Sequence, residues 1–369
     1  MGIDNINDID INIKEKFEKL TKLYGINGEI GEFHKIINGH INETYHVLIE
    51  NKQYIFQKIN TYVFKNPVAV MNNIMMIDNF ITNNLKKSAC KIVTFLVNDD
   101  YKNYTIMDDG EFWRLCIFEA DTVTFDVVEN PEILYSSGYA FGDFLNVISD
   151  FPVEKLNITI PDFHNTKKRL EDFFKTVESD EMNRAKGVKA EIKIFEKYRD
   201  FCCKLTEMTD MGELPLRPVH NDTKYNNILL NQTTFEPVCV LDLDTIMPGL
   251  VSHDFGDAIR FAANKAAEDE IDLGKVYLDV EYFKEFTKGF TKAIEFMTAA
   301  EVETLALGAP IITFELASRF LADHINGDKY FAIHRENHNL DRARCQLKLA
   351  TDMMEKLDDM CEFVQTCIK

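Results

Sequence analysis

The chain has 369 residues, with 41 Lys or Arg against 61 Asp or Glu, so its formal net charge is −20. This acidity argues against a large nucleic-acid or anionic-membrane surface, because such surfaces repel an acidic protein. Hydrophobic residues at 46% and charged residues at 28% exclude wholesale disorder. The chain contains no run of about 18 apolar residues, so the sequence predicts no membrane span.

The eight cysteines include no Cys-x-x-Cys pair. The N-terminal segment MGIDNINDID is polar and acidic, unlike a secretory or transit signal. We therefore expect reduced thiols and a cytoplasmic enzyme or binding protein.

The first third of the chain is predicted to be rich in strands. Apolar residues at helical spacing predict a helix over 11–24, and Pro67 begins a second helix that reaches about residue 84. Short segments rich in Ile, Val, Tyr and Phe predict three strands that form an antiparallel meander, at 31–37, 43–50 and 53–59. Further strands are predicted at 91–97, 104–107 and 112–118.

From Pro131 onward the pattern is mainly helical, interrupted by a loop-and-strand region at 215–257. Strands first and helices second predict an α+β fold with an N-terminal lobe, 1–120, and a C-terminal lobe, 121–369. The expected helices cover 131–149, 166–179, 187–209, 280–296, 299–323 and 340–365.

The segment LRPVHNDTKYNNILLN, residues 216–231, has the residue order of a protein-kinase catalytic loop. Phosphoryl transfer needs a carboxylate to accept the proton of the acceptor hydroxyl, amide and carboxylate oxygens for Mg²⁺, and a nearby cation. The alternative is a polar loop that caps a helix, since Asn and Asp are common in turns. The joint spacing favours the catalytic interpretation for His220, Asp222, Lys224, Asn227 and, after an apolar segment, Asp242 and Asp244.

HNDTKYNN followed by VLDLDTIMPGLVSHDFGDAIR resembles the aminoglycoside phosphotransferase and choline kinase superfamily. Four further blocks are similar to its N-acetylhexosamine 1-kinase branch: NGHINETYHV (38–47), YIFQKIN (54–60), WRLCIFEADTVTFD (113–126) and SRFLADHINGDKYF (318–331). The resemblance covers about residues 25 to 340. It implies a two-lobed, protein-kinase-like fold and transfer of the γ-phosphate of ATP, with Mg²⁺, to the 1-hydroxyl of N-acetylglucosamine or N-acetylgalactosamine.

By position, the resemblance implies that Asp222 is the catalytic base and that Lys224 contacts the γ-phosphate. The implied metal ligands are Asn227, Asp242 and, as a further member, Asp244. His220 is expected to hold the loop by hydrogen bonds rather than to carry a proton. Asp254-Phe255-Gly256-Asp257 is not taken as the metal motif of kinases, because it lies twelve residues past Asp242. Asp254 or Asp257 is instead expected to cap a helix.

The phosphate-covering loop is expected to join the first two strands, where backbone amides of Asn38, Gly39, Asn42 and Thr44 could cover the phosphates. An ordinary hairpin turn is the alternative. On the third strand Lys58 is the preferred phosphate-binding cation, although alternation places Gln57 on the opposite face and leaves open which of the two faces the phosphates. The helix after Pro67 has no Glu to pair with Lys58.

Phe118 and Glu119, where the predicted lobes join, complete the nucleotide residues implied by the resemblance. For the acceptor it implies His40, Asp222, Arg319 and Tyr330. The structural alternatives are a surface salt bridge for Arg319 and core packing for Tyr330. Trp113 is the only tryptophan, and either sugar stacking or a core position fits it.

The alternatives to an N-acetylhexosamine kinase are a kinase for choline, an aminoglycoside or another sugar, and an inactive kinase-like binding protein. A protein kinase is disfavoured because the chain lacks an Ala-Pro-Glu segment. The expected partners are ATP and a small sugar, with no nucleic acid and no membrane. A monomer is expected, and a dimer stays open.

Overall fold

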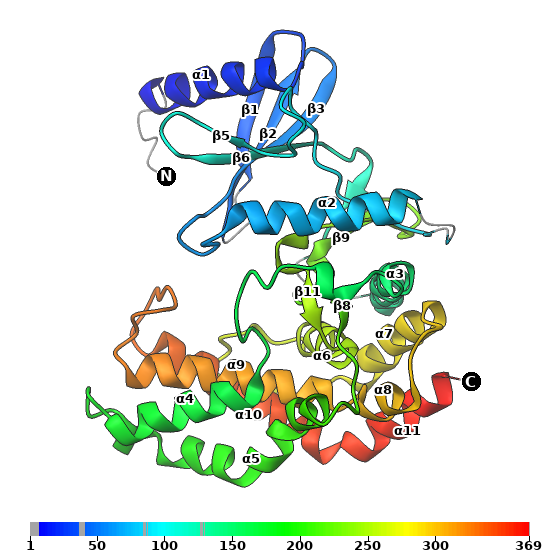
Figure 1. The fold of residues 1–369 in the computed structure, drawn as a ribbon. Helices are drawn as coiled ribbons and strands as arrows, with labels where there is room; N and C mark the ends of the chain where they lie inside the picture. The colour runs from blue at the N-terminus through cyan, green and yellow to red at the C-terminus, as the bar shows by residue number, and fades with distance from the viewer. Residues whose placement is uncertain are drawn as a thin grey trace. The chain divides into compact units, whose positions relative to one another are not determined.

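The computed structural model describes residues 7–36, 41–83, 86, 88–125, 128 and 130–368, which divide into two compact units. Unit 1 comprises described residues of Met1–Thr82 and Ile92–Asp121, and unit 2 those of Asn83–Lys91 and Thr122–Lys369. The first unit combines a β-sheet with two helices and the second is mainly helical, so the predicted α+β class is confirmed (Figure 1). No helix in the described ranges is long and apolar enough to cross a membrane.

Unit 1 is built on a five-stranded sheet with the order β1-β2-β3-β6-β5, and the predicted antiparallel meander is confirmed. The side chain of Phe17, on α1, packs edge-on against the rings of Phe33, Tyr45, Phe56 and Trp113. The elements are α1 (Asn7–Leu23), β1 (Ile30–Ile36), β2 (Glu43–Ile49), β3 (Lys52–Lys58), α2 (Pro67–Asn83), β5 (Thr105–Ile106) and β6 (Phe112–Ile117).

The strand expected at 91–97 is mostly wrong. Only β4 (Lys91–Ile92) is regular, and Phe95 makes a single bridge to Cys116. The reason is that the Phe95 ring packs under the guanidinium of Arg114, 4.4 Å from its centroid, rather than extending a ladder.

Unit 2 contains two small sheets, β4-β10-β9-β7 and β11-β8, among helices. The helices predicted from 131 to 210 and from 280 to 296 are confirmed with small shifts at their ends. The elements are β7 (Thr122–Val123), α3 (Pro131–Ile148), α4 (Thr166–Ser179), α5 (Lys189–Asp210), β8 (Arg217–Val219), β9 (Ile228–Asn231), β10 (Pro237–Val240), β11 (Met247–Gly249), α6 (Val251–Ala262), α7 (Val280–Ala293), α8 (Ala299–Thr304), α9 (Gly308–Ile325), α10 (His338–Glu355) and α11 (Leu357–Cys367).

Two expected helices are each divided. The one predicted over 299–323 is α8 followed by α9, because Pro310 has no N–H to continue the first helix and fits the first turn of the second. The one predicted over 340–365 ends at Glu355 and resumes at Leu357. The Lys356 ammonium binds the Leu278 carbonyl at 3.1 Å, a tertiary contact that apolar spacing does not reveal.

Helices α6 and α9 cross at two glycines. A Cβ on Gly308 would lie 1.7 Å from the carbonyl oxygen of Ser252, and one on Gly256 would lie 2.3 Å from the carbonyl carbon of Gly308. Only glycine permits this backbone approach. The crossing packs the first turn of α6, which carries Asp254, against α9.

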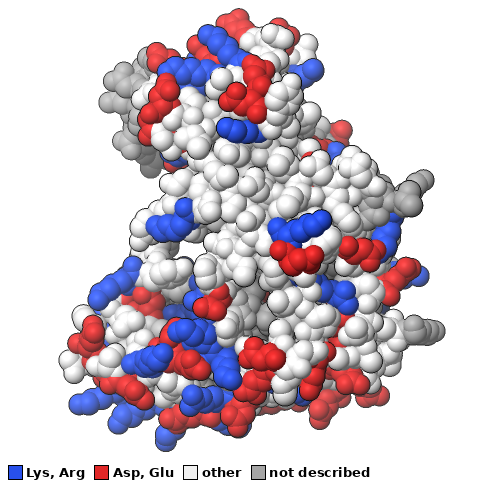
Figure 2. Space-filling model, viewed as in Figure 1, with Lys and Arg blue, Asp and Glu red and all other residues white. Residues whose placement is uncertain are grey.

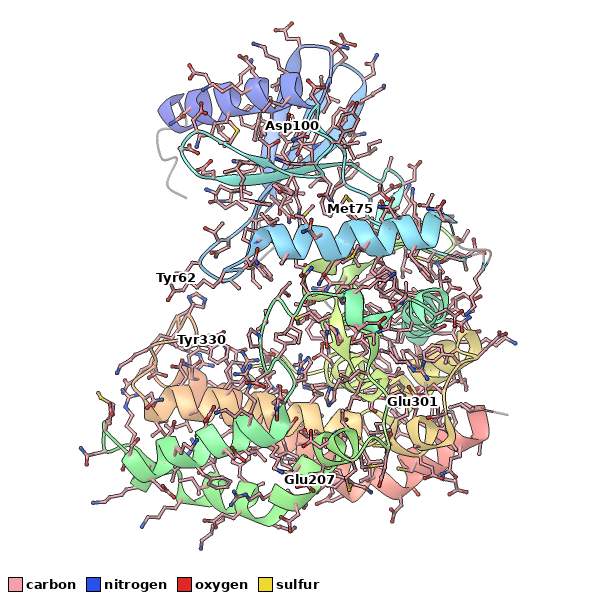
Figure 3. The ribbon with its side chains drawn as sticks, in the orientation of Figure 1. Tyr62, Met75, Asp100, Glu207, Glu301 and Tyr330 are labelled. Carbon is pink, nitrogen blue, oxygen red and sulfur yellow. The ribbon has the colours of Figure 1, made fainter. Side chains whose placement is uncertain are left out.

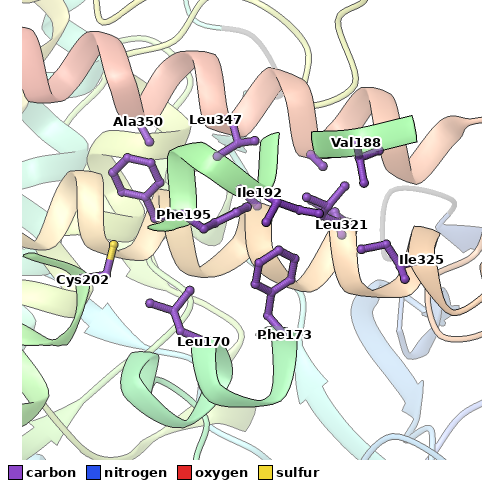
Figure 4. Packing of buried hydrophobic residues seen from close by; sticks show 14 of the residues in the cluster. Leu170, Phe173, Val188, Ile192, Phe195, Cys202, Leu321, Ile325, Leu347 and Ala350 are labelled. Atoms are coloured by element: carbon purple, nitrogen blue, oxygen red, sulfur yellow. The ribbon is translucent and has the colours of Figure 1, made fainter. Parts of the chain in front are cut away.

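The other side of α9 packs against α4, α5 and α10 in a buried apolar cluster (Figure 4). This cluster buries the face of α9 that points away from α6. Its labelled members are Leu170, Phe173, Val188, Ile192, Phe195, Cys202, Leu321, Ile325, Leu347 and Ala350.

On the face shown in Figure 2, acidic and basic side chains of the described residues are interspersed.

Candidate active site

The predicted catalytic loop lies between β8 and β9 and brings three of its residues together. The ammonium of Lys224 lies 3.1 Å from Oδ1 of Asp222. The side-chain N–H of Asn227 donates to the carbonyl oxygen of Asp222 at 2.9 Å and to its Oδ2 at 3.3 Å. The Asp222 side chain keeps 26% of its surface exposed, so its carboxylate is held by the loop yet open to a reactant.

His220 is completely buried beside the rings of Phe141 and Phe144. Its Nε2–H donates to the carbonyl of Leu241 at 2.8 Å, while its Nδ1 accepts the backbone N–H of Asp222 at 3.2 Å. One donor and one acceptor are what a neutral imidazole offers, and burial lowers the pKa of His220. These contacts support the structural role predicted for it.

Leu241 also ties the end of β10 to the loop, because its backbone N–H donates to the carbonyl of Asn227 at 2.8 Å. Asp242 follows with a left-handed φ of 53°, and Asp244 is buried in the 3₁₀ turn Leu243–Thr245. Among the described residues, no three or more His, Cys, Asp or Glu side chains cluster as a metal site. The predicted metal set contains only two carboxylates, and its role stays a prediction.

Asp254 holds the backbone just before Asp222. Its Oδ2 accepts the N–H of His220 at 2.8 Å, and its Oδ1 accepts that of Asn221 at 2.7 Å. The prediction that Asp254 or Asp257 caps the helix is wrong, since both lie inside α6 and the N-cap is Leu250. Burial raises the pKa of Asp254 to about 7, against the opposing effect of the two donors.

Two charged residues of α6, Asp257 and Arg260, also act electrostatically on Lys224. Nη2 of Arg260 lies 2.8 Å from Oδ1 of Asp257. Burial raises the pKa of Asp257, but the positive charges of Arg260 and Lys224 outweigh it and hold that pKa low. The charge of Asp222 is the main cause that raises the pKa of Lys224, so the lysine stays cationic.

Glu315, on α9, supports the same loop through His164. Nδ1 of His164 faces Oε1 of Glu315 at 3.0 Å, and its Nε2 faces the carbonyl of Asn221 at 3.4 Å. Both ring nitrogens meet acceptors, as an imidazolium requires. Burial lowers the pKa of His164, but the hydrogen bond and charge of Glu315 outweigh burial and raise it. Thr166 donates to the other Glu315 oxygen at 2.6 Å.

Sequence reasoning missed His164, Glu315 and the supporting role of Asp254. The available signal for Asp254 was a carboxylate close behind the motif, in the segment VSHDFGDAIRFA of α6. Nothing in the local sequence around His164 or Glu315 points to their partnership, because the two residues are 151 positions apart.

In unit 1, the predicted residues Asn38, Gly39 and His40 lie outside the described residues. Asn42 and Thr44 tie the start of β2 to the end of β3: Oδ1 of Asn42 accepts the backbone N–H of Asn60 at 2.9 Å, and Oγ1 of Thr44 accepts the Gln57 amide at 2.8 Å. Their role at a phosphate stays a prediction.

Gln57 and Lys58 point to opposite sides of β3. Oε1 of Gln57 accepts Nε of Arg114 at 2.8 Å, and the Lys58 ammonium forms ion pairs with Glu43 and, at 3.5 Å, Glu111. Lys58 is therefore more than a solvated charge. These contacts do not decide which side chain meets a phosphate.

Three further predicted residues of unit 1 are Phe118, Glu119 and Trp113. The ring of Phe118 packs edge-on against His46 at 4.8 Å, and Glu119 is half-buried. Trp113 is fully buried, and its Nε1–H donates to Glu111 at 3.0 Å. Trp113 is thus a core residue, and the sugar-stacking alternative is wrong.

In unit 2, the guanidinium of Arg319 lies 5.4 Å from the ring centroid of Phe331. Tyr330 lies in the loop after α9 and is 75% exposed (Figure 3), so the core-packing alternative for it is wrong. The acceptor roles of Arg319 and Tyr330 stay predictions.

The family described as APH, phosphotransferase enzyme family, matches residues 32–283, more than half of the chain and all of the predicted catalytic loop. The chain belongs to this phosphotransferase family. The predicted resemblance to the aminoglycoside phosphotransferase and choline kinase superfamily is thereby confirmed, and the family makes the chain a phosphotransferase.

Several solved kinase and phosphotransferase structures share the fold across nearly all of the chain. A microcompartment-associated aminopropanol kinase matches with a TM-score of 0.64 and 13% identity, over 94% of this chain and 98% of its own. An aminoglycoside phosphotransferase from Alicyclobacillus acidocaldarius matches with a TM-score of 0.63 and 13% identity, over 91% and 93%. An ethanolamine kinase from Plasmodium vivax has a TM-score of 0.53 and 14% identity, over 93% and 90%.

Proposed function

We propose that this phosphotransferase transfers the γ-phosphate of ATP to the anomeric 1-hydroxyl of an N-acetylhexosamine, giving the sugar 1-phosphate. The observation that carries the kinase chemistry is the Asp222 carboxylate, partly exposed and held beside Lys224 and Asn227. The choice of acceptor rests on the similarity of NGHINETYHV and SRFLADHINGDKYF to the N-acetylhexosamine 1-kinase branch.

In this proposal Asp222 orients the acceptor hydroxyl and takes its proton as the oxygen attacks the γ-phosphorus. Asn227 keeps the carboxylate in place through its two hydrogen bonds. Lys224, whose pKa is raised by Asp222, brings a permanent positive charge toward the transferred group. Because Asp254 fixes the two preceding backbone N–H groups, the loop holds this geometry before substrate binds.

The amide oxygen of Asn227 and the carboxylates of Asp242 and Asp244 are hard oxygen donors, the type that Mg²⁺ prefers. Mg²⁺ bound there would neutralise charge on the phosphates. For the nucleotide, we propose Asn38, Gly39, Asn42 and Thr44 together with Lys58, Phe118 and Glu119. For the sugar, we propose His40, Arg319 and Tyr330 together with Asp222.

The similar solved structures are of an aminopropanol kinase, an aminoglycoside phosphotransferase and an ethanolamine kinase, so an amino alcohol or an aminoglycoside is the second candidate acceptor. The deciding experiment incubates the protein with ATP, Mg²⁺ and each of N-acetylglucosamine, N-acetylgalactosamine, glucose, choline, ethanolamine, aminopropanol and an aminoglycoside. Phosphorus NMR then identifies the product. We expect an N-acetylhexosamine 1-phosphate. A sugar 6-phosphate, or a phosphorylated amine alcohol as the only product, would reject the proposed acceptor.

A further inference from the structure

The loop at 326–331, which follows α9, is held by a single carboxylate. Asp323, in the last turn of α9, faces three successive backbone N–H groups of this loop. Its Oδ1 accepts those of Lys329 and Tyr330, and its Oδ2 accepts that of Phe331, each at 2.9 Å. Successive N–H groups that point into one concavity bind an anion, and here the anion belongs to the chain itself. Asp323 is 6% exposed, so these bonds are shielded from water.

Asn339, a buried residue of α10, holds the same carboxylate from the other side. Its side-chain N–H groups donate to Oδ2 of Asp323 and to Oδ1 of Asp328, each at 2.9 Å. Nη1 of Arg184 donates to the other oxygen of Asp328 at 2.6 Å. The Asp323 carboxylate thus accepts hydrogen bonds on both oxygens and has its lone pairs satisfied within the chain. The loop is therefore ordered without a ligand.

This fixed loop presents two polar side chains whose hydrogen-bonding capacity is unused. Tyr330 is 75% exposed although its own backbone N–H is bound to Asp323 (Figure 3). Arg319 lies one helical turn before Asp323, on the same side of α9. Within the described ranges, neither the Tyr330 hydroxyl nor the Arg319 guanidinium forms a hydrogen bond or an ion pair. A hydroxyl and a fork of free N–H donors suit a ligand that carries several hydroxyl oxygens.

Phe331 connects these two side chains. Its ring packs against the buried Phe320 at 4.7 Å and edge-on against Tyr330 at 4.8 Å between centroids. The Arg319 guanidinium lies over the same ring, 5.4 Å from its centroid. Because Asp323 binds the Phe331 N–H, it fixes the ring on which the guanidinium rests. Loss of the carboxylate would thus displace Tyr330 directly and Arg319 through Phe331.

We propose that Asp323 is a positioning residue for the acceptor: by holding the loop at 326–331, it keeps Tyr330 and Arg319 directed at one bound acceptor. This inference rests on the proposed function, which assigns those two side chains to the sugar. It adds that this part of the acceptor site is formed before the sugar binds. Because Asp323 is buried and acts only through its neighbours, its loss should raise the KM for the acceptor and leave kcat and the KM for ATP unchanged.

The test measures steady-state transfer by the full chain, with the acceptor and ATP varied in turn. Asp323→Asn keeps the side-chain shape and places an NH₂ group where an oxygen accepted a backbone N–H. The matched control is Asp352→Asn, because Asp352 of α10 is 8% exposed and accepts the Leu278 N–H at 2.7 Å, but none of its hydrogen bonds reaches the loop. We expect the acceptor KM to rise about tenfold in Asp323→Asn only, while the melting temperature falls in both variants.

Amide hydrogen exchange supplies a readout that does not depend on the reaction. The N–H groups of 329–331 should be protected in the wild type and in Asp352→Asn, and should exchange faster in Asp323→Asn. A second variant, Phe331→Leu, keeps the backbone bonds to Asp323 and removes the ring beneath Arg319. It should raise the acceptor KM with the amide protection retained, and it serves if Asp323→Asn does not fold.

An unchanged acceptor KM in Asp323→Asn, or in Phe331→Leu where Asp323→Asn does not fold, would overturn the inference, as would equal rises in Asp323→Asn and Asp352→Asn. If the wild type phosphorylates N-acetylhexosamine in that case, the proposed function still stands. If the wild type phosphorylates another acceptor instead, the proposed function fails, and a rise in the KM for that acceptor in Asp323→Asn alone would keep Asp323 as a positioning residue. If no acceptor is phosphorylated, both fail.

Discussion

Asp254 accepts the backbone N–H of Asn221 at 2.7 Å, so a helix carboxylate fixes the residue that precedes the proposed catalytic base. Asn221 has a left-handed φ of 64°, a conformation that Asn tolerates better than most residues but that still needs support. Helix α6 supplies this support from one side. His164, paired with Glu315 of α9, supplies it from the other.

Asp254→Asn should lower both stability and turnover. The new NH₂ group would face a backbone N–H in place of an accepting oxygen, leaving one buried donor without a partner. We expect a loss of about 1–3 kcal/mol in the free energy of unfolding. Urea unfolding followed by circular dichroism measures it, and a variant as stable as the wild type at every pH would show that these two bonds do not hold the loop.

The cost of Asp254→Asn should also depend on pH. The folded-state pKa of Asp254 is raised to about 7 from an ordinary value of 3.8. The stability that comes from its bound proton is therefore complete below about pH 4 and is lost as the pH rises through 7. The stability gap between wild type and variant should be larger at pH 5 than at pH 8. The same gap at both pH values would mean that the Asp254 pKa is not raised.

Glu315→Gln should lower the stability of the protein, because it removes the carboxylate that keeps His164 protonated. Without the carboxylate, burial dominates and the pKa of His164 falls, so the ring can no longer donate from both nitrogens. We expect a loss of about 3–5 kcal/mol in stability, as for other broken buried ion pairs. Thr166→Val is the matched control, because it removes a neutral hydrogen bond to Glu315 and leaves the ion pair. It should cost about 1 kcal/mol.

The stabilisation from the His164–Glu315 ion pair should fall as the pH rises. A carboxylate with a lowered pKa shows the opposite dependence, because its contribution to stability grows with pH. Because the folded pKa of His164 is raised above 6.5, its ion-pair stabilisation is complete below pH 6.5 and is lost as the pH rises through the raised value. The gap between wild type and Glu315→Gln should therefore shrink from pH 6 to pH 9. A gap that grows over this interval would contradict the paired imidazolium.

Gly308→Ala should be strongly destabilising. Its Cβ would lie 1.7 Å from the Ser252 carbonyl oxygen, so α6 and α9 would have to separate. We expect a cost of about 3 kcal/mol, the upper end of the usual cost of overpacking, measured as a shift of the urea midpoint. Gly187→Ala is the control, since a Cβ there meets no atom within 4 Å. Equal midpoints for the two variants would contradict the close crossing.

Asp242→Ala should abolish transfer, and excess EDTA should do the same to the wild type until Mg²⁺ is restored. A coupled assay of ADP release follows both. Wild-type activity that persists in excess EDTA would reject the proposed metal requirement.

The spacing of His220, Asp222 and Asn227 is local, so the sequence was sufficient to predict their proximity. The alternation of β2 and β3 and the apolar spacing of most helices were predictable for the same reason. The supports of the loop were not, because the Asp254 and Glu315 contacts join segments far apart in the chain and depend on packing. The break before α9 likewise follows from Pro310 and from the approach of Gly308 to Ser252, which apolar spacing does not report.

The most direct measurement is the turnover of Asp222→Asn with N-acetylglucosamine, ATP and Mg²⁺. The substitution keeps the side-chain shape and removes the proton acceptor. We predict a fall in kcat of about 10²–10⁴-fold, with melting temperature and ATP affinity unchanged. Turnover near that of the wild type would show that Asp222 is not the base.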